Sequence, residues 1–117
     1  QITRGNPEAL TAEIIFDHVR LNDPLALSLR DTACLMLARV LGQILNLLSP
    51  SLIVLCGGVM KSADLILRKV VEYLPEYSLG VMRKHCEIKA GELGPDAGVI
   101  GAAAYALMQI RKTGDSV

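Results

Sequence analysis

The stretch LIVLCGGVMKS, residues 52–62, decides the fold. Residues 52–56 are apolar at every position and rich in branched side chains, which is typical of a central parallel strand covered on both faces. Gly57 and Gly58 end this strand, and a helix is expected to follow from residue 61 to about residue 74. A strand, a tight turn and a helix in succession indicate an α/β fold.

Two helices are predicted before this strand. A short amphipathic helix is expected over residues 11–20, and a long one over residues 24–48. Asp23 can accept a hydrogen bond from a free backbone N–H group, and Pro24 suits the first helical position. The long helix is apolar nearly all round from residue 33 onward, so we expect it to be buried on most sides.

The long helix carries one narrow polar seam. Arg39, Gln43 and Asn46 stand at positions i, i+4 and i+7, and therefore on one side of the helix. A strip that faces solvent is favoured over a strip that faces a ligand cleft.

A second strand and a last helix are predicted after the glycine pair. Apolar and charged residues alternate over residues 86–90, which indicates a half-exposed strand. Asp96 is expected to cap a helix that reaches about Lys112, and the small residues over 98–104 indicate close helix packing. The order is helix, helix, strand, helix, strand, helix. This order predicts an α/β lobe with parallel strands over residues 11–117, preceded by a linker over residues 1–10.

Two strands do not form a stable sheet. A strand as apolar as residues 52–56 needs neighbours on both sides, so the sequence implies further strands from elsewhere in a longer chain or from another copy. We therefore expect the chain to self-associate as a homo-oligomer.

Composition excludes several function classes. The 117 residues carry 12 basic and 12 acidic side chains, so no basic face is available for direct contact with nucleic acid. No apolar run of membrane-spanning length lacks a polar interruption, and neither a membrane contact nor a signal peptide is predicted. The three cysteines, Cys34, Cys56 and Cys86, are too far apart for a disulfide framework or a zinc site, and buried free thiols in the cytoplasm are expected.

The glycine junction is the strongest candidate for a ligand site. Gly57 and Gly58 allow close backbone approach at the carboxyl end of a parallel strand, where ligands of open α/β folds bind. The segment 94–98, Gly-Pro-Asp-Ala-Gly, is a second strand-to-helix turn on the same edge. On their own, a tight turn at the glycine pair and a plain N-cap role for Asp96 are the favoured interpretations. The glycine and lysine spacing fits neither a P-loop nor a dinucleotide fingerprint.

No catalytic set and no metal site is predicted. His85 and Cys86 are expected to point to opposite faces of a strand, and His18 has no ligand-type neighbour. The carboxylates are expected on solvated helix faces, at Glu13, Asp17, Asp23, Asp31 and Asp64.

Three segments together resemble the ROK family of sugar kinases and sugar-responsive repressors. They are the run over residues 47–59, the run from Gly94 to Ala103, and Asn22-Asp23-Pro24-Leu25-Ala26. The resemblance covers nearly the whole chain. It implies the carboxy-terminal part of an actin-like, ribonuclease-H-like ATPase lobe.

The resemblance also implies a function. ROK kinases phosphorylate a hexose or an amino sugar with ATP and magnesium, and in that scheme Gly57, Gly58 and Val59 line the adenosine side of the nucleotide site. The turn formed by Asp96, Ala97 and Gly98 is expected nearby. The family's phosphate-binding segment, catalytic Asp, sugar contacts and cysteine-rich zinc motif are expected upstream of Gln1, so this part alone is expected to be inactive. The alternative is the effector-binding lobe of a ROK-type repressor.

Overall fold

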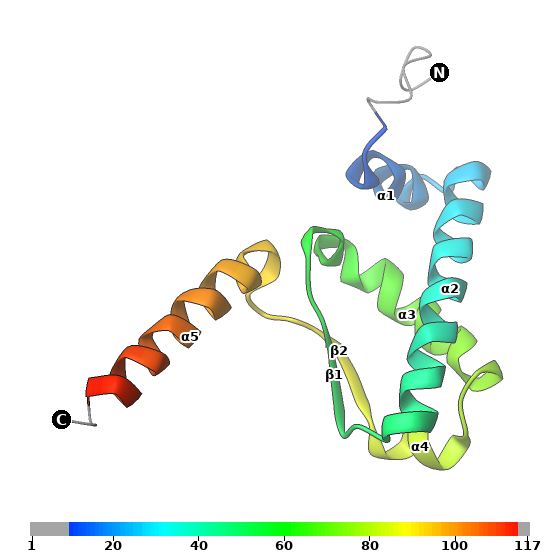
Figure 1. Cartoon of the computed structure of the whole chain (residues 1–117). Coiled ribbons are helices and arrows are strands. Elements are labelled where there is room, and N and C mark those ends of the chain that lie inside the picture. The colour runs from blue at the N-terminus through cyan, green and yellow to red at the C-terminus, as the bar shows by residue number, and fades with distance from the viewer. Residues whose placement is uncertain (1–9, 115–117) are drawn as a thin grey trace.

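The computed structural model describes residues 10–114, and the predicted elements appear in the predicted order (Figure 1). The α-helices are α1 (Ala12–Arg20), α2 (Pro24–Leu48), α3 (Ala63–Tyr73), α4 (Gly80–His85) and α5 (Ala97–Gly114). The strands are β1 (Leu52–Leu55) and β2 (Glu87–Ala90), and the 3₁₀ turns are η2 (Gly58–Ser62), η3 (Leu74–Glu76) and η4 (Gly94–Asp96). The linker predicted over residues 1–10 lies, except for Leu10, outside the described residues.

The two strands pair in parallel, as predicted. Leu52 is opposite Glu87 and Leu55 is opposite Ala90, and the segment between the strands crosses over through α3 and α4. α4 is a short helix that the sequence pattern did not predict. Because α4 ends at His85 and β2 begins at Glu87, the expectation that His85 and Cys86 lie on one strand and point to its opposite faces is wrong.

The caps of the long helix follow from its sequence. Asp23 accepts a hydrogen bond from the backbone N–H of Ala26 at 2.9 Å, and Pro24 takes the first helical position. The helix ends where Ser49 adopts a left-handed conformation with φ of 46°.

The hydrophobic core lies between α2, α3 and one face of the sheet. Seven buried residues form it: Cys34, Ala38, Leu41, Leu45, Ile66, Val70 and Leu74. Ile53, Leu55 and Ile88 of the strands pack against this cluster from one side. The core therefore fixes both helices over the sheet.

Burial is less complete than the sequence indicates. Leu52 and Val54 are each 44% exposed, so β1 is covered on one face and not on both. α2 is buried along one side only, and its opposite side is exposed along most of its length. Both expectations are wrong for residues 10–114, because their elements form a single layer of helices on one sheet face.

Among the described residues, α2 is also the helix that is long and apolar enough to cross a membrane, by length and composition alone. The core helix of a water-soluble protein has the same properties. Ala38 and Leu45, on one side of α2, are completely buried in the core.

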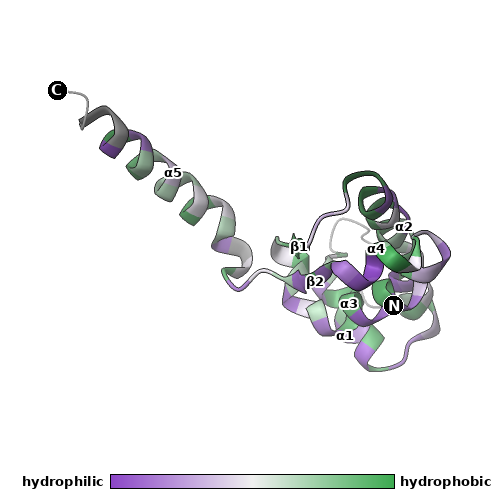
Figure 2. Cartoon of the chain, turned by 90° about the horizontal axis from the view of Figure 1, so that it is seen from below, coloured by the Kyte–Doolittle hydropathy of each residue, from purple (hydrophilic) through white to green (hydrophobic). Residues whose placement is uncertain are grey.

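The last helix extends away from the rest of the chain. Figures 1 and 2 show α5 projecting from η4 without another helix or strand beside it. A side chain placed at Gly98 or Gly101 would meet no atom within 4 Å. The close packing expected for this small-residue face is therefore absent within residues 10–114.

The helix expected from residue 61 to about residue 74 is confirmed as α3, which begins at Ala63 after the 3₁₀ turn η2. The expectation of buried cysteines is confirmed only in part. Of the three cysteines, Cys34 is buried and Cys86 is half-buried, but Cys56 is exposed because the chain turns outward after β1.

Candidate functional site

The glycine pair forms a turn in which each glycine has a different reason to be there. Gly57 has φ of 117°, a conformation that side chains with a Cβ rarely adopt. Gly58 has an ordinary φ, and a Cβ at this position would meet no atom of the chain within 4 Å. The fold itself therefore requires glycine at position 57 but not at position 58.

The two predicted glycine turns lie side by side. The backbone N–H of Gly91 donates to the carbonyl oxygen of Leu55 at 2.8 Å, which extends the pairing of β1 and β2 by one step. Beyond this bond the chain enters η2 on one strand and η4 on the other, and these two turns contact each other. The prediction that both turns share one edge of the sheet is confirmed.

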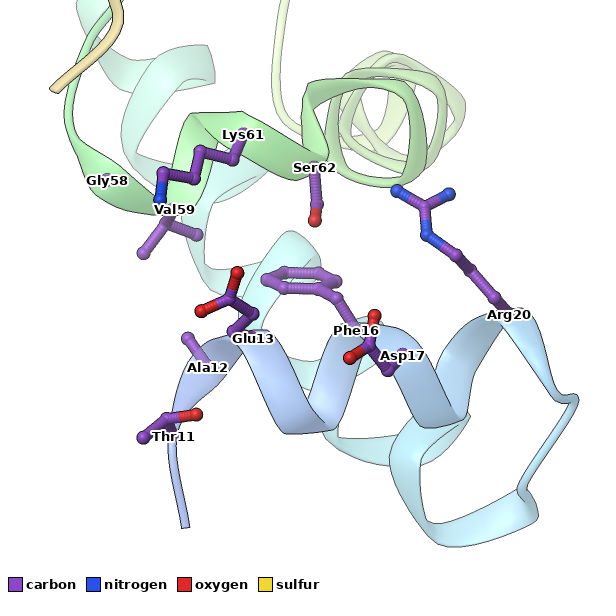
Figure 3. A pocket seen from close by; sticks show the side chains of 10 residues that line it. All are labelled: Thr11, Ala12, Glu13, Phe16, Asp17, Arg20, Gly58, Val59, Lys61 and Ser62. Carbon is purple, nitrogen blue, oxygen red and sulfur yellow. The ribbon is translucent and has the colours of Figure 1, made fainter. Parts of the chain in front are cut away.

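A cleft of about 550 Å³ opens between η2 and α1. Gly58, Val59, Lys61 and Ser62 form one wall, and α1 forms the other (Figure 3). The residues of the second wall are Thr11, Ala12, Glu13, Phe16, Asp17 and Arg20. Its size is within the range of pockets that bind small molecules and cofactors.

The lining combines apolar and charged side chains. In Figure 3 the Phe16 ring lies in the middle of the cleft, with Val59 and Ser62 across from it. The Glu13 carboxylate lies beside the ring on the side of Val59. The cleft therefore offers a flat apolar surface with hydrogen-bonding groups around it.

An ion pair beside the cleft joins α1 to α3. Arg20 donates to the Asp64 carboxylate through two nitrogens, at 3.0 and 3.4 Å. This hydrogen bonding lowers the pKa of Asp64 and raises the pKa of Arg20. Lys61, by contrast, forms no ion pair within residues 10–114, so its charge is available to a ligand.

Only some of the predicted site residues line the cleft. Gly58 and Val59 line the cleft, and Gly57 stands directly before them as the turn residue. Asp96, Ala97 and Gly98 lie on the adjoining turn and do not line the cleft. Asp96 ends η4 and directly precedes Ala97, the first residue of α5, so it stands at the position expected for an N-cap of that helix.

The second wall of the cleft, formed by α1, was not predicted from the sequence. Glu13, Phe16, Asp17 and Arg20 are spaced by three, four and seven residues, which places them on one face of α1. This spacing predicts that the four side chains share one face of the helix, but it does not predict which element that face lies against. The described residues contain no group of three or more His, Cys, Asp or Glu side chains that could hold a metal ion.

Comparison with known proteins gives a consistent result. A model of the ROK family matches residues 1–109. A glucokinase of Thermotoga maritima is 31% identical over 104 residues, which is 86% of this chain and 32% of that protein. A glucokinase of Halalkalibacterium halodurans is 35% identical over 92 residues, which is 79% of this chain and 28% of that protein.

A solved structure shows the same fold. A Cytophaga hutchinsonii protein described as a sugar kinase superposes with a TM-score of 0.75 at 23% sequence identity, over 90% of this chain and 35% of that one. This likeness confirms the predicted fold class, an α/β part of an actin-like ATPase lobe. The chain spans about a third of the length of each relative that it matches. Because the family model matches nearly its whole length, the chain belongs to the ROK family.

Proposed function

We propose that this chain forms the nucleotide-binding part of an ATP-dependent sugar kinase of the ROK type. The reaction of the whole protein transfers the terminal phosphoryl group of ATP to a hydroxyl group of a hexose or an amino sugar, in the cytoplasm. Relatives of this chain are glucokinases, which supports a sugar as the acceptor. Residues 10–114 contribute nucleotide contacts, and the sugar and the magnesium ion are bound by other parts of the protein.

The observation that carries the proposal is the open space at Gly58. Neither the backbone conformation at this position nor a close contact within the chain requires a glycine. It stands in the wall of a cleft large enough for a nucleoside, at the carboxyl end of a parallel strand. A ligand that approaches the backbone closely explains why no side chain is present there.

The lining suits the adenosine end of ATP. Phe16 and Val59 provide apolar area against which a purine ring can pack. Glu13 and Ser62 can hydrogen-bond to ribose or base, and Lys61 can attract a phosphate group.

Titration of the intact protein with ATP tests the proposal. Gly58→Val fills the space that the ligand needs, and we expect it to weaken ATP binding by about 10- to 100-fold, which corresponds to about 1.4–2.7 kcal/mol. Binding of the sugar is expected to remain within about twofold of wild type. The position is open and its φ is ordinary, so the variant should fold as the wild type does.

Gly80→Ala is the matched control. Gly80 lies at the start of α4, and a Cβ there meets only the flexible end of Arg83 at 3.7 Å. This variant should bind ATP like the wild type. Unchanged ATP affinity in Gly58→Val, or an intact protein that binds sugar but no nucleotide, would contradict the proposal and favour a sugar-responsive regulator.

A further inference from the structure

A second cavity, of about 400 Å³, opens between α1, α2 and α3. We call it the basic cavity, because four cationic side chains and only two carboxylates line it. The cations are Arg20, Arg30, Arg68 and Lys69, and the carboxylates are Asp64 and Glu72. The cations come from all three helices, so positive charge reaches the basic cavity from several directions.

Two of these cations are sheltered from solvent and held by their neighbours. Arg30 donates to Asp31 through Nε at 2.7 Å, and its side chain is 16% exposed. Lys69 donates to Glu72 at 2.8 Å, and its Nζ lies 4.9 Å from the centre of the Tyr73 ring. Charges that are already positioned and partly buried attract an anion more strongly than mobile charges in bulk water, because less side-chain entropy is lost and the local dielectric constant is lower.

Arg68 is the cation of the basic cavity that has no carboxylate partner. It forms no ion pair within residues 10–114, whereas each of the other three cations does. The ion pairs therefore leave one positive charge at the basic cavity unneutralised. A guanidinium whose N–H groups are free can bind a phosphate group through two parallel hydrogen bonds.

The arrangement favours a phosphate group over a carboxylate. Donors that reach the basic cavity from three helices can surround a tetrahedral anion, whereas a carboxylate accepts hydrogen bonds mainly in one plane. The basic cavity is also larger than a phosphate ion requires, and Val19, Leu27 and Leu65 add apolar surface to its lining. This apolar surface suits the organic part of a phosphate ester.

We propose that the basic cavity binds the phosphate group of a small metabolite, at a site separate from the cleft between α1 and η2. Arg68 and Lys69 bind the phosphate oxygens, and Arg30 adds positive charge beside them. Arg20 lines both the basic cavity and the cleft, and Figure 3 shows its side chain extending from α1 toward α3. Because the two sites adjoin at Arg20, the experiment has to distinguish a free phosphate compound from the phosphates of a nucleotide.

Calorimetric titration of the intact protein tests the site, with inorganic phosphate and glycerol 3-phosphate as probes at constant ionic strength. Arg68→Gln removes the unpaired charge, and we expect the dissociation constants of both probes to rise by at least about 10-fold. The affinity for ATP should stay within about twofold of wild type, because Arg68 lies outside the cleft. Arg68 is exposed, so the variant should fold as the wild type does.

Lys84→Gln is the matched control. Lys84 is an exposed cation on α4, lies outside the basic cavity and forms no ion pair within the described part of the chain. This variant loses the same net charge as Arg68→Gln but should bind both probes like the wild type. Tighter binding of glycerol 3-phosphate than of inorganic phosphate would support an ester as the ligand, and equal binding would support the free ion.

Acetylation of lysine side chains locates the bound phosphate independently. A phosphate in the basic cavity covers the amine of Lys69, which is 21% exposed. Acetylation of Lys69 should therefore slow by about 10-fold when inorganic phosphate is at about ten times its dissociation constant, while acetylation of Lys84 should not change.

Four results would each overturn the proposal. They are a wild-type protein that binds neither probe, phosphate binding that Arg68→Gln leaves unchanged or that Lys84→Gln weakens equally, a loss of ATP affinity that accompanies the loss of phosphate affinity in Arg68→Gln, and acetylation of Lys69 that phosphate does not slow.

Discussion

The sulfur of Cys56 occupies the space in which a side chain at Gly91 would lie. A methyl group on Gly91 would stand 2.6 Å from Sγ of Cys56, well inside the sum of their radii. The same glycine donates its backbone N–H to Leu55 at 2.8 Å. The carboxyl ends of β1 and β2 are thereby held together, and the two glycine turns leave the sheet next to each other.

Gly91→Ala should lower the free energy of unfolding by about 1–3 kcal/mol, because the new methyl group overlaps the Cys56 sulfur. Replacing Cys56 by alanine removes that sulfur and should restore most of the loss. Urea denaturation of both single variants and of the double variant measures the coupling. Additive effects of the two substitutions would show that the contact does not limit this position.

Asn46→Ala should destabilise the protein by about 1–2 kcal/mol, because the amide links α2 to the turn after η3 through two hydrogen bonds. Nδ2 of Asn46 donates to the carbonyl oxygen of Tyr77 at 3.0 Å, and Oδ1 accepts from the backbone N–H of Leu79 at 2.9 Å. Denaturation midpoints measure the effect. Gln43→Ala, on the same polar seam, is the control for stability and should change it by less than about 0.5 kcal/mol.

The three thiols should react in an order set by their burial. Cys56 is exposed and should be alkylated first. Burial raises the pKa of Cys34, so this group stays a protonated thiol at neutral pH and should react only when the chain unfolds. Burial also raises the pKa of Cys86. Peptide mapping after timed alkylation at pH 8 checks the order, and early labelling of Cys34 would mean that the α2–α3 core opens readily.

Acid should weaken the ion pair between Arg20 and Asp64. The folded pKa of Asp64 lies below its ordinary value of 3.8, so the stabilisation is present above that value and is lost as the pH falls through the lowered one. Asp64→Asn should therefore lose less stability than wild type between pH 5 and pH 3. Both side chains are largely exposed, so the difference should be small and should shrink in added salt. Equal losses in both proteins would exclude a contribution from this pair.

The local features of the fold were predictable from the sequence. The helix start at Asp23 and Pro24 follows from capping chemistry, and the parallel strand before Gly57 follows from an unbroken apolar run. The half-exposed second strand is confirmed by its alternating burial. These features depend on neighbouring residues, so a local pattern determines them.

Features that depend on distant contacts were not predictable in the same way. The apolar side chains of Val54 and Met36 indicated full burial, but both are exposed in residues 10–114. An apolar side chain favours burial without indicating which other segment or molecule covers it. The α1 wall of the cleft was missed for a related reason: Glu13 and Asp17 read as solvated, and only the fold places them opposite Gly58. Asn46 likewise appeared to face solvent, although its partners lie 31 and 33 residues away.

Photolabelling of the intact protein with 8-azido-ATP tests the central claim most directly, namely that the cleft between α1 and η2 holds the adenosine end of a nucleotide. After digestion, labelled peptides are expected from residues 11–20 or 58–62, with labelling suppressed by excess ATP. Labels that are confined to other segments, or that ATP does not suppress, would contradict it.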